Sequence, residues 1–308
     1  MITTCNRRDR LREVLAPVLN DPDTLEVVVV VDACRDGSIE LLRAMERDQP
    51  KLRAVMPDQN LGQPRARLFG VEHAHGDVVL SLDDDVVAHD GLVGGHRCHH
   101  ARRLHAVVLG YMPTETPSRR QAGQFATFEY AKVYEDYCAV YERDPANVLS
   151  NLWGGNFSVR RQDFLASVEG YDFPLRYHED RDLGLRFKRL GLEPVFDRSL
   201  RAIHRHERSF DAYLRDARSA GAGSQLLAAL HPDLLAPISV DDAIPHYSLP
   251  ARYAVRWSDV RWARAVILAA LRGAVVASGR LRAYALEAKF AAVAKHVAER
   301  EGARSVAS

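Results

Sequence analysis

Three consecutive aspartates, Asp83, Asp84 and Asp85, directly follow the apolar run 77–82 (DVVLSL), which is typical of a buried strand. Side chains alternate in direction where a strand ends, so Asp83 and Asp85 are expected to point into one site. Two convergent carboxylates repel each other unless a cation lies between them, and hard oxygen ligands favour Mg²⁺ or Mn²⁺. Such a cation could neutralise a departing diphosphate group. The alternative is a solvated acidic turn.

A second carboxylate at a predicted strand end is Asp32, which follows the β-branched run 25–31 (LEVVVVV). It could accept hydrogen bonds from a nucleobase N–H or from ribose hydroxyls. Asp36 and Ser38 lie just beyond it, and both residue types are common at helix N-caps. We therefore expect Asp32 to contact a nucleotide and Ser38 to serve the following helix.

Two further segments could approach a phosphate or a sugar. A turn that enters a helix carries Arg65 and Arg67, and either side chain could reach a phosphate or orient the carboxylate of Asp32. Gly154 and Gly155, followed by Asn156, are small residues past which a sugar could come close to the backbone. The competing interpretations are ordinary surface arginines and a plain turn.

Acidic and imidazole side chains also appear later in the chain. Glu179 and Asp180 open a predicted helix, where a carboxylate either caps the helix or acts as a general base toward an acceptor hydroxyl. His204 and His206 alternate near a presumed strand end, and one of them could complete a metal shell. A purely structural role is the alternative for both pairs.

The elements that must position these residues alternate between strand and helix. Predicted strands cover 25–31, 52–56, 77–82 and 106–111, and predicted helices cover 10–19, 38–47, 65–74, 121–141, 180–190 and the chain from 250 onward. In open α/β sheets, ligands bind at the carboxyl ends of the strands. The pattern therefore predicts an α/β fold with a nucleotide-type crevice where the polar residues gather.

Taken together, these segments resemble the family 2 glycosyltransferases, which have the GT-A fold. The stretch 76–85 (GDVVLSLDDD) matches the G-(D/E)-x-(V/I)-x-x-L-D-x-D pattern of that family. The segment 3–7 (TTCNR) is similar to its P-T-x-N-R strand ending, with Thr3 where proline is usual, and 32–38 (DACRDGS) is similar to D-G-S-x-D-G-T. Further matches are N-x-G…A-R at 60–67, G-G-N at 154–156, G-Y-D at 170–172 and E-D-x-D-L-x-x-R at 179–186.

The resemblance implies inverting transfer of a sugar from a nucleoside-diphosphate sugar, with a UDP-sugar as the first guess, to an acceptor hydroxyl. Asp180 stands at the position of the catalytic base, with Glu179 beside it. The implied ligands of Mn²⁺ or Mg²⁺ are Asp85, Asp83 and His204, and the implied sugar-binding turn is Gly154, Gly155 and Asn156. The implied contacts to the donor nucleotide are Thr3, Cys5, Arg7, Asp32, Gly62, Arg67, Asp83 and Asp84.

The same resemblance implies a Rossmann-like GT-A sandwich with a mixed, mostly parallel sheet. We expect a donor half at 1–110, an acceptor and catalytic half at 111–225, and a helical basic appendage at 226–308. From 251 to 308, eleven basic residues face four acidic ones, a local net charge of +7 within a chain of net charge +1. The appendage is expected to lie on an anionic membrane surface, or to pack on the catalytic domain or on a second subunit.

The overall composition bounds these expectations. A net charge of +1 argues against a nucleic-acid partner. Four scattered cysteines indicate reduced thiols, and neither a signal peptide nor an apolar run of bilayer length is evident. The expected location is the cytoplasm, with peripheral contact at the inner face of the membrane as the variant to test.

Three enzyme classes and one non-catalytic class compete with this interpretation. A haloacid-dehalogenase-like phosphohydrolase would use Asp83 and Asp85, but its motif normally opens the domain. A sugar-nucleotide pyrophosphorylase and a dinucleotide oxidoreductase each need a glycine-rich loop that the chain lacks. A non-catalytic sugar-binding protein would not need both the aspartate cluster and Asp180.

Overall fold

The computed structural model describes residues 1–236 and 239–307. Two compact units divide the chain. The first, here called the sheet unit, comprises Met1–Glu115, Tyr134–Pro174 and Glu179–Arg205. The second, here called the helical unit, comprises Thr116–Val133, Leu175–His178 and His206–Ser308. The expected boundary at 225/226 lies inside helix α9 (Phe210–Leu230), so α9 belongs to the helical unit as a whole.

The sheet unit contains one eight-stranded mixed sheet in the order β3-β2-β1-β4-β7-β6-β8-β5. Strands β3, β2, β1 and β4 run parallel, β7 is antiparallel to both neighbours, and β5 is antiparallel to β8. This is the mixed, mostly parallel sheet that the sequence predicts. The strands are β1 (Ile2–Thr4), β2 (Val27–Val31), β3 (Leu52–Val55), β4 (Val78–Asp83), β5 (Val86–Ala88), β6 (Ala106–Tyr111), β7 (Asn156–Arg160) and β8 (Glu193–His204).

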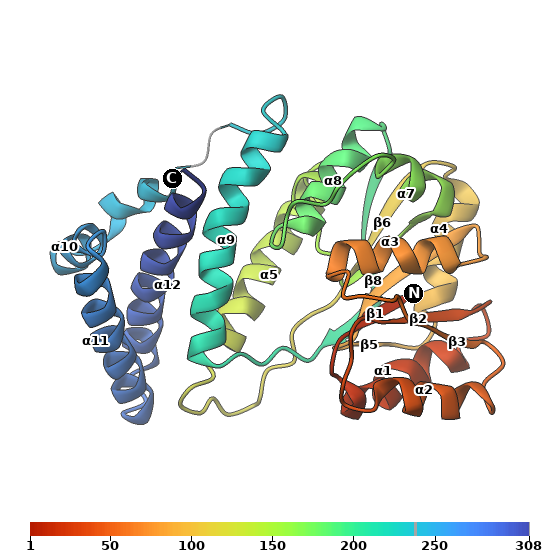
Figure 1. Ribbon diagram of the computed structural model, residues 1–308, viewed down its shortest axis with the longest axis horizontal. Helices are drawn as coiled ribbons and strands as arrows, with labels where there is room; N and C mark the ends of the chain where they lie inside the picture. Colours follow the sequence, from red (N-terminus) through yellow and green to blue (C-terminus); the bar gives the residue numbers. More distant parts are fainter. Residues whose placement is uncertain (237–238, 308) are drawn as a thin grey trace. The chain divides into compact units, whose positions relative to one another are not determined.

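Helices cover both faces of this sheet (Figure 1). All five valines of β2 are buried; Val27, Val29 and Val31 belong to one core, and Val28 belongs to the other. Continuous burial explains why β2 reads as an unbroken apolar run. The first core is closed by α1 (Arg8–Asn20), α2 (Ser38–Glu46) and α4 (Leu92–Arg102), and the second by α3 (Gln63–His73), α6 (Asn147–Ser150), α7 (Arg161–Ser167) and α8 (Glu179–Arg189).

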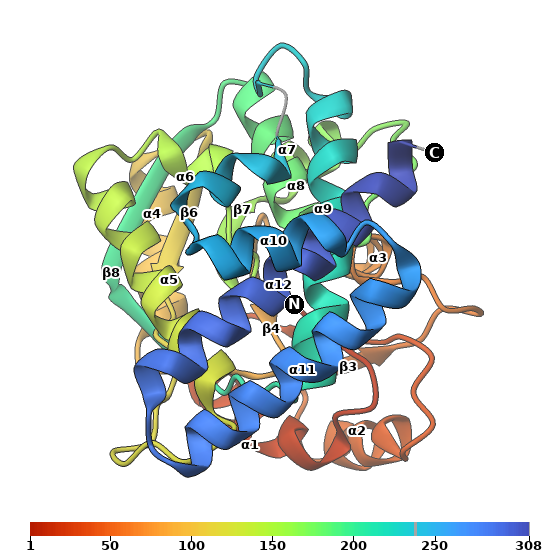
Figure 2. The same ribbon diagram turned by 90° about the vertical axis from the view of Figure 1, so that its left-hand side faces the viewer.

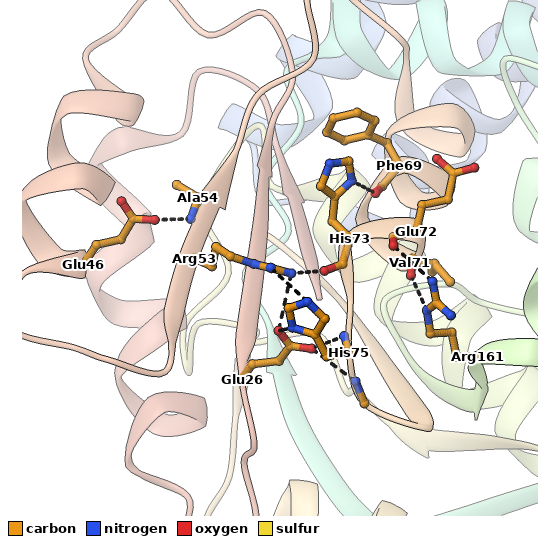
Figure 3. A network of polar contacts seen from close by, with 11 residues as sticks. Glu26, Glu46, Arg53, Ala54, Phe69, Val71, Glu72, His73, His75 and Arg161 are labelled. Carbon is orange, nitrogen blue, oxygen red and sulfur yellow. Dashed lines mark hydrogen bonds and ion pairs between the residues drawn. The ribbon is translucent and has the colours of Figure 1, made fainter.

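A polar network holds the amino ends of strands β2 and β3 and the turn before β4 (Figure 3). Arg53 of β3 donates to the His73 carbonyl at the end of α3 and lies 3.5 Å from Glu26, which precedes β2. Glu26 in turn accepts from the backbone N–H of Gly76, at 3.2 Å, in the turn before β4. Arg161 donates to the Val71 carbonyl at 2.9 Å. These contacts fix the end of α3 against the amino ends of the strands. The first turn of α3 is thereby held near the carboxyl ends of the strands.

The helical unit is built from the first part of α5 (Phe125–Arg143), α9, a 3₁₀ helix η1 (Val240–His246) and the helices α10 (Leu249–Trp257), α11 (Arg261–Arg280) and α12 (Tyr284–Ala307). Figure 2 shows α10, α11 and α12 of this unit toward the viewer. Helices α9 and α12 approach so closely that a Cβ on Gly221 or Gly302 would lie 1.9 Å from a backbone oxygen of the other helix. Glycine at these two positions therefore permits the contact.

Helix α11 corrects one expectation from the sequence. Arg264 and Arg272 interrupt its apolar stretch, yet its 20 residues reach a mean hydropathy of 1.3 over an 18-residue window. By length and composition alone, this helix could cross a membrane. Only 22% of that window is buried inside the structure, although Ile267, Leu268 and Leu271 pack against cores of the helical unit.

Candidate active site at the carboxyl ends of the strands

The three aspartates take three different partners. Asp83 ends β4, where its Oδ1 accepts from Gln63 Nε2 at 3.3 Å and lies 3.9 Å from Arg67 Nη2. Asp84 Oδ2 accepts from the Thr4 hydroxyl at 2.8 Å. Asp85 lies in the turn to β5. Because β4 ends at Asp83, the alternation of side-chain directions also ends there. Asp85 therefore does not share the partners of Asp83.

Asp85 pairs instead with His204. The carboxylate Oδ1 lies 3.3 Å from His204 Nε2, and Oδ2 lies 3.9 Å from Arg7 Nη2. The antiparallel pairing of β5 with β8 sets Val86 opposite His204, which brings the imidazole beside Asp85. In the described part of the chain, no group of three histidine, cysteine or acidic side chains converges as a metal shell. Of the predicted ligands Asp83, Asp85 and His204, the structure brings Asp85 and His204 together, and the metal role of all three stays a prediction.

The electrostatics of the cluster favour a cation. Burial, together with the charges of Asp180, Asp85 and Asp84, raises the pKa of Asp83 to about 8, although Arg67 opposes the shift. Burial also raises the pKa of Asp84. A carboxylate and an imidazole suit Mn²⁺, and Mn²⁺ or Mg²⁺ accepts phosphate oxygens at its remaining positions. The donor set therefore fits a divalent ion held by Asp85 and His204, with a ligand completing the shell.

Asp180 is held from two sides at the start of α8. Arg67 Nη1 donates to Asp180 Oδ1 at 2.6 Å, and the backbone N–H of Gly154 donates to Oδ2 at 2.9 Å. The Arg67 side chain is only 2% exposed, whereas Asp180 keeps 24% exposure. Arg67 thus lies between Asp180 and Asp83. The guanidinium holds these two carboxylates in the structure, and its predicted contact to the donor nucleotide stays a prediction.

Glu179, the first residue of α8, has a different electrostatic environment. Burial and the neighbouring charge of Asp180 raise its pKa to about 7. At neutral pH this side chain exchanges protons readily, whereas a carboxylate in water would be fully ionised. Glu179 therefore stands beside the candidate base as a group that can carry a proton.

The Gly154–Gly155 turn lies against both carboxylates. The backbone N–H of Asp83 donates to the Gly155 carbonyl at 3.3 Å, following the pairing of Leu82 with Asn156 between β4 and β7. A Cβ at Gly155 would lie 2.9 Å from Asp83 Oδ2. The glycines therefore permit a close approach of this turn to the acidic cluster.

Replacing Gly154 with alanine is expected to displace the candidate base. The added Cβ would lie 2.2 Å from Asp180 Oδ1 and 2.6 Å from Arg67 Nη2, so the carboxylate must move. A misplacement of about 1 Å costs roughly a hundredfold in rate. We expect Gly154→Ala to lower kcat about that much in a transfer assay. Gly273→Ala, where nothing lies within 4 Å, is the control, and equal rates for the two variants would contradict the argument.

Asp32 organises a loop of the protein. Its buried carboxylate accepts from the backbone N–H groups of Leu61 at 2.8 Å and Gly62 at 2.9 Å. Gly62 has φ +71°, which favours glycine there. Arg65 pairs with Asp172 and Arg67 with Asp180, so the idea that either arginine orients Asp32 is wrong.

The last residue of β1 and the loop that follows it supply two residues that the sequence did not single out, Thr4 and Asn6. Thr4 holds Asp84, as described above. Asn6 has φ +54°, and its Oδ1 accepts from the backbone N–H of Arg35 at 2.8 Å. Asn6 thereby joins this segment to the loop after β2. An asparagine between a strand and a helix start is the signal that could have revealed it, because asparagine tolerates the left-handed region.

Asn156 is the first residue of β7 and lies within the sheet. It is fully buried, its Nδ2 donates to the Leu200 carbonyl at 3.0 Å, and its Oδ1 lies 3.1 Å from His96 Nε2. Because it is buried and bonded within the sheet, its predicted contact with the sugar is corrected to a supporting role for the turn that precedes it. The other expected histidine, His206, belongs to the helical unit, where its ring stacks on Tyr130 at 4.0 Å between centroids.

His96 and His100 flank Ser158, with ring nitrogens 2.8 Å from its hydroxyl on each side. Burial lowers the pKa of His96 to about 3 and that of His100 to about 4. Both rings are therefore neutral in the folded protein, whereas in the unfolded chain they take up protons below about pH 6.5. Folding stability from these rings is fully present above that pH and falls as the pH drops toward 3.

His96→Gln is expected to remove one of these contributions. Wild type should lose about 1.4 kcal/mol per pH unit relative to the variant between pH 6 and 4, since only wild type carries the His96 titration. Urea unfolding of both proteins at several pH values measures the difference. His89→Gln, at an exposed position, controls for loss of an imidazole. A difference between wild type and His96→Gln that is independent of pH would refute the assignment.

The arrangement of sheet, strand-end carboxylates and helix α8 defines a glycosyltransferase of the GT-A type. Residues 1–165 match the description "Glycosyl transferase family 2", and the chain belongs to that family. It is a glycosyltransferase, which sets aside the phosphohydrolase and non-catalytic alternatives.

Solved structures show the same fold at low identity. The mannosyltransferase PcManGT from Pyrobaculum calidifontis, in complex with GDP-Man and Mn²⁺, is 17% identical and has a TM-score of 0.59, over 97% of this chain and 85% of that one. TarS 1-349 of S. aureus, in complex with UDP-GlcNAc, is 15% identical with a TM-score of 0.50, over 94% and 89%.

Curated relatives match over a shorter stretch. An undecaprenyl-phosphate 4-deoxy-4-formamido-L-arabinose transferase from Pseudomonas aeruginosa is 43% identical over 77 residues, which is 25% of this chain and 23% of that protein. The Edwardsiella ictaluri protein of the same name is 35% identical over 91 residues, 28% of each chain. The match thus spans about a quarter of the length of these relatives.

Proposed function

We propose that this glycosyltransferase moves a sugar from a nucleoside-diphosphate sugar to an acceptor hydroxyl by a single displacement with inversion. The observation that carries the proposal is Arg67, which pairs with Asp180 and also lies 3.9 Å from Asp83. One buried guanidinium thereby connects the candidate base to Asp83 at the end of β4. A direct displacement needs the proton acceptor and the donor site to lie close together, and Arg67 contacts a carboxylate of each.

In this mechanism Asp180 accepts the proton of the acceptor hydroxyl. Its oxygen attacks the anomeric carbon, and the bond from that carbon to the diphosphate breaks. Arg67 and the Gly154 N–H hold the carboxylate in one orientation while it does so. Asp85 and His204 would hold Mn²⁺ or Mg²⁺, which when bound neutralises charge on the leaving diphosphate.

The donor contacts remain proposals, with a UDP-sugar as the first donor to test. Thr3, Cys5, Arg7 and Asp84 lie around the end of β1 and the β4–β5 turn, and Asp32 and Gly62 shape the neighbouring loop. These positions line the carboxyl ends of the parallel strands, where ligands of such sheets bind. We assign Gly154 and Gly155 to the transferred sugar because the turn lies against both carboxylates.

The named substrate of the short curated matches supports a second acceptor class, a lipid phosphate. A phosphate oxygen is already anionic near neutral pH and requires no general base. The two acceptors therefore differ in their need for Asp180. For either acceptor class, we propose that the enzyme is cytoplasmic and has access to the inner face of the membrane.

The proposal is tested by product release. The protein is incubated with UDP-, dTDP- and GDP-sugars and Mn²⁺, with octyl glycoside and undecaprenyl phosphate as acceptors, and nucleoside diphosphate is measured. We expect release from one donor class, dependent on an acceptor and stopped by a chelator. Release that a chelator leaves unchanged would contradict the metal assignment. Absence of release from every donor would contradict the proposed reaction.

A further inference from the structure

Helix α11 carries an apolar stripe on its exposed half. Trp262 is 67% exposed and Val266 62%, and Val276, at 46%, continues the same side of the helix. The residues between them on that side are Ala269 and Gly273, both exposed. Spacings of three and four residues set all five on one face. A core helix would bury such a stripe, whereas here the opposite side of α11, with Ala263 and Val275, is the buried one.

Arginines frame this stripe at both ends. Arg256 at the end of α10 and Arg261 at the start of α11 are exposed, as are Arg280 and Arg282 at the other end. Within the described residues, none of the four makes an ion pair or a side-chain hydrogen bond. No acidic residue occurs from 260 to 286, so their charge is unbalanced locally.

We propose that this surface binds an anionic phospholipid membrane, with α11 lying in the interface. The basic–aromatic face is defined by Arg256, Trp257, Arg261, Trp262, Arg280 and Arg282. Tryptophan rings are favoured at the level of lipid headgroups, and guanidinium groups pair with phosphate in two-pronged hydrogen bonds. An apolar stripe bounded by cationic side chains is the pattern of a helix that lies on a membrane.

Two other occupants fit less well. Insertion of α11 across the bilayer would break the ion pairs of Arg272 with Asp211 and of Arg264 with Glu301, which tie it to the helical unit. A second copy docked symmetrically through the same face would bring the unpaired arginines of one copy close to those of the other. Like charges across an interface are unfavourable. Anionic lipid removes both difficulties.

The test is co-sedimentation of the full chain with vesicles of phosphatidylcholine alone, or of phosphatidylcholine with phosphatidylglycerol in equal parts. We expect binding to the anionic vesicles and a marked decrease in high salt. The double variant Arg280→Gln/Arg282→Gln should bind roughly thirtyfold more weakly, at about fivefold per arginine. Trp262→Ala should weaken binding by roughly tenfold.

Controls are taken from exposed positions of the sheet unit. Arg12→Gln/Arg47→Gln removes two exposed arginines, and Leu104→Ala removes an apolar side chain that is 71% exposed. Both should bind as wild type does. Thermal midpoints confirm that each variant folds. Vesicle binding needs neither nucleotide nor acceptor, so its outcome is independent of the proposed reaction.

Three results would overturn the inference. The first is no binding to anionic vesicles at low salt. The second is binding that neither Arg280→Gln/Arg282→Gln nor Trp262→Ala weakens. The third is a dimer in solution that Trp262→Ala dissociates, in a protein that does not bind vesicles.

A fluorescence measurement supplements sedimentation. It uses a Trp153→Phe background, which leaves Trp257 and Trp262 as the fluorophores. Brominated lipid should quench their emission. Undiminished emission with bound vesicles would place another surface on the membrane.

Discussion

Replacing Asp180 with asparagine should lower transfer to a hydroxyl acceptor by roughly a thousandfold, the usual contribution of a general base. The substitution keeps the shape of the side chain but removes its charge and its ability to take a proton. Both donors that face Asp180, Arg67 and the Gly154 N–H, lose a carboxylate partner. Donor binding should persist, because Arg67 stays next to Asp83. Initial rates and nucleotide-induced thermal shifts measure the two effects separately.

Asp182→Asn is the matched control for this variant. Asp182 lies in the same first turn of α8 and pairs with Arg186 at 3.1 Å, away from Arg67. We expect its transfer rate to stay within a few-fold of wild type once folding is confirmed. If Asp180→Asn keeps its rate on hydroxyl acceptors, the base lies elsewhere. If it loses the hydroxyl reaction but keeps transfer to undecaprenyl phosphate, the second acceptor class is the natural one.

Asp85→Ala and His204→Ala should each lower transfer by roughly a hundredfold or more, since each removes half of the protein's hold on the cation. The side chains lie 3.3 Å apart and are expected to act as one unit. The double variant should therefore be little worse than either single variant. Rates at increasing Mn²⁺ concentration provide the measurement, and partial rescue at high Mn²⁺ is expected of the single variants.

Asp90→Ala, at an exposed position just beyond β5, is the control for this pair. Its Mn²⁺ dependence should match that of wild type. Full activity of Asp85→Ala in the presence of a chelator would show that Asp85 holds no cation needed for the reaction. Additive losses in the double variant would show that the two side chains act separately.

Local patterns in the sequence predict the strands β2, β3, β4 and β6 and their carboxyl ends well, whereas they gave no strand at β5, β7 or β8. The run 106–111 was predicted as a strand and is β6 at the same bounds, and β2 is the β-branched run shortened by two residues at its start. Both are continuous apolar segments, and burial on two faces leaves a clear signal. The class of fold and the strand-end position of Asp83 and Asp32 follow from that signal alone.

The partners of the site residues depend on long-range pairing, which no local pattern contains. Asp85 meets His204 only because β5 pairs antiparallel with β8 in one register. Arg67 reaches Asp180 because α3 and α8 begin at the same edge of the sheet, across 113 residues of sequence. Asn156 looked accessible beside two glycines, but the pairing of β4 with β7 buries it. The sequence therefore predicts which residue types matter better than it predicts which atoms they contact.

The central claim is that Asp85, together with His204, holds a nucleoside diphosphate through a divalent cation. The most direct measurement is the thermal midpoint of the protein with UDP, dTDP or GDP, each with and without Mn²⁺, in wild type and in Asp85→Ala. Ligand binding to the folded state raises the midpoint. We predict that one nucleotide stabilises wild type only when Mn²⁺ is present, and that Asp85→Ala abolishes the shift. The same shift without metal, or in Asp85→Ala, would contradict the claim.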